Sequence, residues 1–84
     1  MRNFRFMVEA RDATGAFFVT CNVVAESLEA GRAKLKEYSS QARWQITNWE
    51  DQEDLGVDDI FTEPGVVSET ARSYFDVRKG IEPL

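Results

Sequence analysis

Apolar and polar residues alternate along the first 25 positions of the chain. In FRFMVEA (residues 4–10), every second residue from Phe4 onwards is apolar, and most residues between them are charged. In AFFVTCNVVA (residues 16–25), the alternate positions that start at Phe17 are again apolar. A period of two places such residues on one face of a β-strand. The intervening RDATG contains Gly15, which suits a tight turn, so the pattern predicts a β-hairpin.

The apolar spacing changes to three and four residues after Ser27, which is typical of a helix with one buried face. Ser27 is placed to cap the N-terminus of this helix. The residues on its inner face would be Leu28, Gly31, Leu35, Tyr38 and Ala42. Gly31 lowers the intrinsic stability of a helix, but it would let the helix approach the sheet closely. We expect the helix to end near Ser39 and Ser40.

A third strand is predicted after this helix. RWQITNWE (residues 43–50) alternates with a period of two, which places Trp44 and Ile46 on one face and Trp49 on the other. This strand would run directly into an acidic segment at residues 50–63.

A second helix is predicted near the C-terminus, over about residues 69–79. Ser68 can cap it, Glu69 favours its N-terminus, and Gly80 can end it. The tail, residues 81–84, is expected to be loose.

Together these elements predict one α+β domain over residues 1–84, with the order β-β-α-β-α. The third strand pairs most simply with the first, which gives an antiparallel three-stranded sheet of order 2-1-3 with the first helix on one face. The second face then carries Met7, Phe18 and Val24. Either the second helix covers this face, or two copies of the chain pair through it as a homodimeric accessory or regulatory module.

The charge of the chain is concentrated in one segment. The formal net charge is −5, yet residues 1–43 sum to +2, residues 44–63 to −7 and residues 64–84 to zero. The stretch NWEDQEDLGVDDIFTE (residues 48–63) contains seven acids and no base. The acids are Glu50, Asp51, Glu53, Asp54, Asp58, Asp59 and Glu63.

The composition excludes several kinds of catalysis. The chain has no histidine and one cysteine, so histidine-dependent nucleophile systems and zinc sites within one chain are ruled out. Paired carboxylates work as acid and base when burial separates their pKa values, and these acids are expected to be exposed. Cys21 is expected to be a small buried hydrophobe. We therefore expect no enzymatic activity, no catalytic residue and no cofactor.

A metal site is one possible role for the acidic segment. An EF-hand loop that begins at Asp51 would have Gly56 at its sixth position, but Leu55 and Thr62 stand where oxygen ligands of positions five and twelve belong. A looser Mg²⁺ or Ca²⁺ site would need Asp51, Asp54, Asp58 and Asp59 to converge. Because apolar residues separate them into two groups, we expect no metal site, and a small enzyme that depends on a divalent metal ion is the third interpretation of the sequence.

The remaining choice for the segment is a solvated surface or a binding surface. The acids could enter a groove lined by Lys and Arg that normally holds phosphates, and the apolar residues among them could act as anchors. The candidate partner-binding residues are Trp49, Glu50, Asp51, Glu53, Asp54, Asp58, Asp59 and Phe61. Direct binding of nucleic acid is disfavoured by the negative net charge. The expected partner is therefore a protein with a basic surface.

The order of elements adds a resemblance. A hairpin followed by VVAESLEAGRAKLKEY and then an aromatic and acidic strand, over residues 4–55, resembles small phage- and plasmid-encoded accessory proteins with a ββαβ plan, anti-CRISPR inhibitors among them. The resemblance implies a monomeric or homodimeric inhibitor of a host nucleic-acid-handling complex. The alternating N-terminus and the single cysteine lead us to expect a cytoplasmic protein, in the host cytoplasm if phage-encoded, with no membrane partner.

Overall fold

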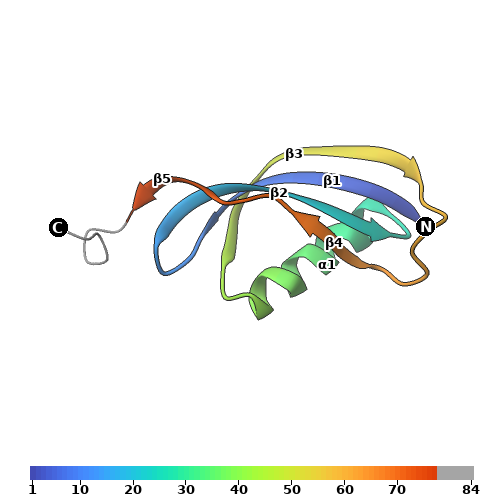
Figure 1. The fold of residues 1–84 in the computed structure, drawn as a ribbon, viewed down its shortest axis with the longest axis horizontal. Coiled ribbons are helices and arrows are strands. Elements are labelled where there is room, and N and C mark those ends of the chain that lie inside the picture. The colour runs from blue at the N-terminus through green and yellow to red at the C-terminus, as the bar shows by residue number, and fades with distance from the viewer. Residues whose placement is uncertain (78–84) are drawn as a thin grey trace.

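The computed structural model describes residues 1–77, which form one antiparallel sheet and one helix (Figure 1). The strands are β1 (Arg2–Arg11), β2 (Gly15–Ala25), β3 (Gln45–Val57), β4 (Gly65–Glu69) and β5 (Ser73–Val77). The helix α1 (Leu28–Gln41) lies between β2 and β3 in the chain. The sheet order is β3-β1-β2-β4, and β5 pairs with β2 on the same edge as β4. The predicted α+β class is confirmed, whereas the three-stranded sheet of the prediction is enlarged to five strands.

The hydrophobic core lies between α1 and one face of the sheet. Its strand residues are Phe4, Phe6, Val8 and Ala10 of β1 and Phe17, Val19, Cys21, Val23 and Ala25 of β2. Leu35 fills the core from the helix and is fully buried. A Cβ atom on Gly31 would lie 3.3 Å from the ring of Phe6, so the missing side chain allows the close approach that the sequence predicted. The alternating pattern of the hairpin thus selects the face that α1 covers.

Both ends of α1 are closed by recognisable caps. The Oγ of Ser27 accepts a hydrogen bond from the Ala30 N–H at 3.1 Å, as expected of an N-cap. At the other end, the N–H of Arg43 donates to the Ser40 carbonyl and the N–H of Trp44 donates to the Ser39 carbonyl. This pair of bonds is a Schellman motif, and it requires Arg43 to adopt a φ of 65°. The motif turns Trp44 back over the core, where it is 4% exposed.

The predicted C-terminal helix is wrong for the residues that the structure describes. Residues 65–77 instead form β4 and β5, two short strands in succession along the outer edge of β2. The N–H of Thr70 bridges the gap between them by donating to the Thr20 carbonyl at 2.9 Å. β2 is buried along most of its length, so the backbone N–H and C=O groups on its outer edge need hydrogen-bond partners. Two strands can supply these partners, whereas a helix could not. The expectations for residues 78–84 lie outside the described residues.

Val24 keeps the face that the sequence predicted but is not exposed on it. The regular pairing of β2 with β1 places Val24 on the same face as Met7 and Phe18, yet it is fully buried beside its strand partners Asn3 of β1 and Gly65 of β4. Met7 and Phe18 do lie on that face and are 42% and 36% exposed.

Candidate functional site

The acidic segment is largely a strand rather than a loop. Residues 50–57 belong to β3, which forms one edge of the sheet and pairs only with β1 among the described strands. Residues 58–64 then turn towards β4. Every acid of the segment is exposed except Asp58, which is half-buried. The sequence prediction that these acids are exposed is thus confirmed for all of them except Asp58.

Three irregularities interrupt the pairing of β3 with β1. The register skips Thr47, Glu50 and Leu55, so each is an extra residue, or β-bulge, in β3. An odd number of extra residues exchanges the two faces of a strand. The first bulge therefore brings Trp49 onto the same face as Ile46, and the predicted orientation of Trp49 is wrong.

Trp49 contributes to the core side of the sheet. Its ring lies edge-on to Phe6, with 5.4 Å between the centroids, and the Arg32 guanidinium lies 5.3 Å from the Trp49 ring centroid. Arg32 also donates hydrogen bonds to the Gln52 side chain. Trp49 is therefore half-buried beneath a helix side chain, so it supports β3 rather than projecting from it.

Two acids of β3 form ion pairs with β1. Arg5 contacts the Glu53 carboxylate, and the Arg2 Nε donates to Asp54 Oδ2 at 2.9 Å. The hydrogen bond from Arg2, aided by one from the Gly56 N–H, lowers the pKa of Asp54. Asp51 and Asp59 have no basic partner among the described residues. These two acids therefore keep their full charge available to a partner.

Exposed apolar residues and two acids lie together at the end of β3, and we call this segment the β3 tip. It consists of Leu55, Val57, Asp58, Asp59, Ile60 and Phe61. Ile60 is 81% exposed and Val57 is 69% exposed. The turn is held in place because Asp58 Oδ2 accepts from the Phe61 N–H, and the Asp58 N–H donates to the Met1 carbonyl, both at 2.9 Å. Asp58 is thus a structural residue of the tip.

The acids do not converge on a point. Within residues 1–77, no group of three or more Asp, Glu or Cys side chains is placed to hold a metal ion. The strand geometry explains this, because Asp51 and Glu53 lie on one face of β3 and Asp54 lies on the other. Asp58 is committed to its own turn.

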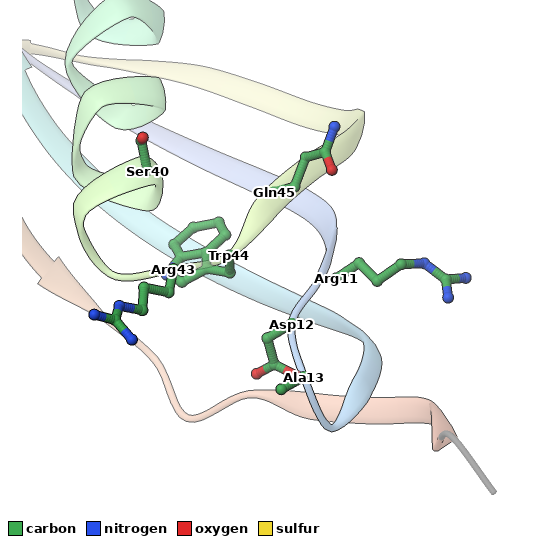
Figure 2. A pocket seen from close by; sticks show the side chains of 7 residues that line it. All are labelled: Arg11, Asp12, Ala13, Ser40, Arg43, Trp44 and Gln45. Atoms are coloured by element: carbon green, nitrogen blue, oxygen red, sulfur yellow. The ribbon is translucent and has the colours of Figure 1, made fainter. Parts of the chain in front are cut away.

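A hollow of the described surface lies at the opposite end of the sheet (Figure 2). It measures about 480 Å³ and is lined by Arg11, Asp12, Ala13, Ser40, Arg43, Trp44 and Gln45. In Figure 2 the side chains of Arg11 and Arg43 point away from each other. The Asp12 carboxylate is already bound by Arg72 and Tyr74. The hollow therefore lacks the convergent polar groups of a ligand site.

Cys21 is fully buried on the core face of β2. Burial, together with the nearby negative charge of Glu69, raises the pKa of its thiol to about 12. Because the thiolate is the reactive form, Cys21 is inert at neutral pH, and the prediction of a small buried hydrophobe is confirmed.

Comparisons with known proteins give no further guide to this surface. The chain matches no family model, no curated protein and no solved structure. Within the described residues, α1 is too short and too polar to cross a bilayer.

Proposed function

We propose that this chain is a non-enzymatic protein-binding module that presents the outer edge of β3 and the β3 tip to a basic surface of a partner protein. The observation that carries the proposal is the exposure of Ile60 and Val57 beside acids that have no basic partner. Large apolar side chains that stand exposed on a rigid turn are suited to act as anchors, while a charged rim steers the approach and selects the partner.

The geometry of β3 supports a partner that normally handles nucleic acid. Glu50, Asp51, Glu53 and Asp54 fall within five residues of an extended strand, so the edge carries a carboxylate every ~4 Å on average. One strand of a nucleic-acid duplex carries a phosphate every ~3.4 Å along its axis. Carboxylates at this density, carried on both faces of the strand, suit a groove lined by Lys and Arg. In its specific form, the proposal is a phage-type, anti-CRISPR-like inhibitor that occupies such a groove.

The contact would be made by side chains. β3 offers an unpaired backbone edge, but its bulges and its charges are the features by which edge strands resist the addition of another strand. Regular pairing with a partner strand is therefore disfavoured. The carboxylates and the apolar residues of the tip remain as the binding groups.

The test is a capture experiment with the tagged chain and extracts of candidate bacterial hosts, followed by identification of the bound protein. Asp51→Lys with Asp59→Lys should abolish capture, because both reverse unpaired charges of the surface. The matched control is Glu26→Lys with Glu37→Lys, which changes the net charge equally at exposed positions outside β3. The control should capture as well as the wild type.

Two outcomes would count against the proposal. Equal loss of capture in both double variants would show that only the net charge matters. Undiminished capture by the first double variant would show that the β3 edge is not the site. Ile60→Ala tests the anchor separately, and it should weaken binding without changing the fold, because Ile60 is 81% exposed.

A further inference from the structure

A second hollow of the described surface lies between α1 and β3, and we call it the α1–β3 groove. It measures about 340 Å³, and among the residues that line it are Lys36, Ser40, Trp44, Gln45, Ile46 and Trp49. Figure 2 shows Ser40 on α1 and Gln45 on β3 on either side of Trp44. The volume is at the lower end of the range for small-molecule sites, so the groove suits a ligand of one or two rings.

The apolar part of the groove is mainly aromatic. Both tryptophans of the chain line it, and Ile46 lies between them in the sequence. Trp44 packs edge-on against Phe17, with 5.7 Å between the ring centroids, and Trp49 packs edge-on against Phe6. Ile46 and Trp49 are half-buried, so part of each side chain remains open to the groove. Rings that core contacts hold in place offer a preformed surface for a planar ligand.

The groove is positively charged, although the chain as a whole has a net charge of −5. Lys36 is exposed and forms no ion pair with any described residue, and no carboxylate lines the groove. Arg32, one helical turn before Lys36, lies over the Trp49 ring and likewise has no acidic partner within residues 1–77. Exposed charges are screened over ~8 Å at physiological ionic strength, so the nearest charges decide what the groove attracts.

The acid nearest to the groove in sequence is directed away from it. Glu50 follows Trp49, and its carboxylate accepts a hydrogen bond at 2.6 Å from Asn48 Nδ2. Asn48 pairs with Glu9, whereas Trp49 pairs with Val8, so Asn48 and Trp49 lie on opposite faces of the sheet. The Glu50 carboxylate is therefore held on the side of Asn48.

The C-terminus of α1 would also oppose an anion, because its carbonyl groups carry partial negative charge. The carbonyls of Ser39 and Ser40 already accept hydrogen bonds from the N–H groups of Trp44 and Arg43. Their partial charge is thus largely compensated within the Schellman motif, and the full charge of Lys36 dominates.

We propose that the α1–β3 groove is a binding site for a small aromatic carboxylate. The ring of the ligand packs on Trp49 and Ile46, and its carboxylate pairs with Lys36. Ser40 and Gln45 are exposed at the rim, and their hydroxyl and amide groups are donors suited to the same carboxylate. A neutral aromatic ligand would keep the apolar contacts but lose the charge interaction.

The experiment is an NMR titration of the isotope-labelled chain with cinnamate. Because both tryptophans line the groove, their two indole N–H signals report binding there. Both signals should shift saturably. The neutral analogue cinnamamide keeps the ring, so it should bind about two- to fivefold more weakly, which is the effect of an exposed ion pair.

The contribution of Lys36 is tested by charge reversal. Lys36→Glu should weaken the binding of cinnamate about five- to tenfold, because it replaces an attraction by a repulsion, and it should leave the binding of cinnamamide nearly unchanged. The matched control is Lys34→Glu, which changes the net charge equally on the same helix but lines a different hollow, beside β4. The control should bind cinnamate like the wild type.

Four outcomes would overturn the proposal. Indole signals that do not shift saturably would show that the groove is empty of this ligand class. Equal affinities for cinnamate and cinnamamide would show no preference for an anion. Equal weakening in Lys34→Glu and Lys36→Glu would show that only the net charge matters. Shifts confined to the β3 tip or to the surroundings of Phe18 and Phe75 would show adventitious binding to other exposed apolar residues.

The result is independent of the proposed function. Lys36→Glu leaves the acids of β3 and the β3 tip unchanged, so it should still capture a basic partner. Asp51→Lys with Asp59→Lys changes no residue that lines the groove and should still bind cinnamate. Failure of one proposal is thus distinguishable from failure of the other.

Discussion

The Arg72 guanidinium donates a hydrogen bond to the carboxylate of Asp12, which lies 60 positions earlier in the chain. The same guanidinium lies 4.9 Å from the ring centroid of Phe17 and 5.8 Å from that of Trp44. The Tyr74 hydroxyl donates to Asp12 as well. Asp12 also caps the β1–β2 turn, where its Oδ1 accepts from the N–H groups of Thr14 and Gly15. One carboxylate therefore ties the C-terminal strands to the hairpin.

The first prediction concerns this carboxylate. Asp12→Ala should lower the free energy of unfolding by about 2–3 kcal/mol, because it removes the partner of Arg72 where the Asp12 side chain is only 10% exposed. Chemical denaturation measures the loss. The matched control is Asp76→Ala, which removes an exposed pair with Arg11 and should cost at most about 1 kcal/mol. Equal losses in the two variants would contradict the special role of Asp12.

The second prediction is the pH dependence of the same link. Burial raises the pKa of Asp12, but the hydrogen bonds from Tyr74, Gly15, Thr14 and Arg72 outweigh it and lower the pKa below its ordinary value. A carboxyl group with a lowered folded pKa stabilises the fold above its unfolded pKa of about 3.9. That stabilisation is lost as the pH falls through the folded pKa.

Acid titration of stability checks this expectation. The wild type should lose stability steeply below about pH 4, and Asp12→Asn should be less stable at neutral pH but lose less on acidification. Parallel pH profiles of the two proteins would mean that other carboxyl groups dominate the acid response.

The hairpin and α1 were predictable because the sequence pattern of each segment agrees with the way that the segment packs in the fold. Alternation from Phe4 and Phe17 gave the core face, and Ser27 marked the start of α1. The prediction of a C-terminal helix was wrong because SETARSYFDVRKG contains residues that are typical of helix ends. Tyr74 and Phe75, adjacent in sequence, pack on opposite faces, against Phe17 and Phe18 respectively. The need of β2 for edge partners is a tertiary property that local spacing does not reveal.

The candidate site was predictable in its charge but not in its geometry. The exposure of the acids followed from their density. The extra residues Thr47, Glu50 and Leu55 depend on the register with β1, so the face of Trp49 could not be read from alternation. The ion pairs of Glu53 and Asp54 likewise depend on which strand lies beside them.

The third prediction uses the C-terminal cap of α1. Arg43→Gly should raise the free energy of unfolding by about 1 kcal/mol, because a side chain at a φ of 65° is strained and glycine is not. Thermal or chemical denaturation measures the gain. The matched control is Lys36→Gly, at an exposed position inside the helix, which should lower stability by about 1 kcal/mol. A loss of stability in Arg43→Gly would show that its side chain contributes more than the strain costs.

The last prediction asks whether the acids of β3 act as a metal site or as a surface. A converging site would gain stability from Ca²⁺ or Mg²⁺ by mass action, roughly 2.7 kcal/mol at a hundredfold excess over the dissociation constant. Glu53 and Asp54 are held by arginines, and Asp58 is held by its own turn, so the acids lack a common centre. We therefore expect the melting temperature to be the same in divalent and sodium salts at matched ionic strength, since both only screen the surface charge. Differential scanning calorimetry with each salt measures this. A saturable shift with Ca²⁺ that disappears in Asp51→Asn would contradict it and would favour a metal-dependent role for the segment.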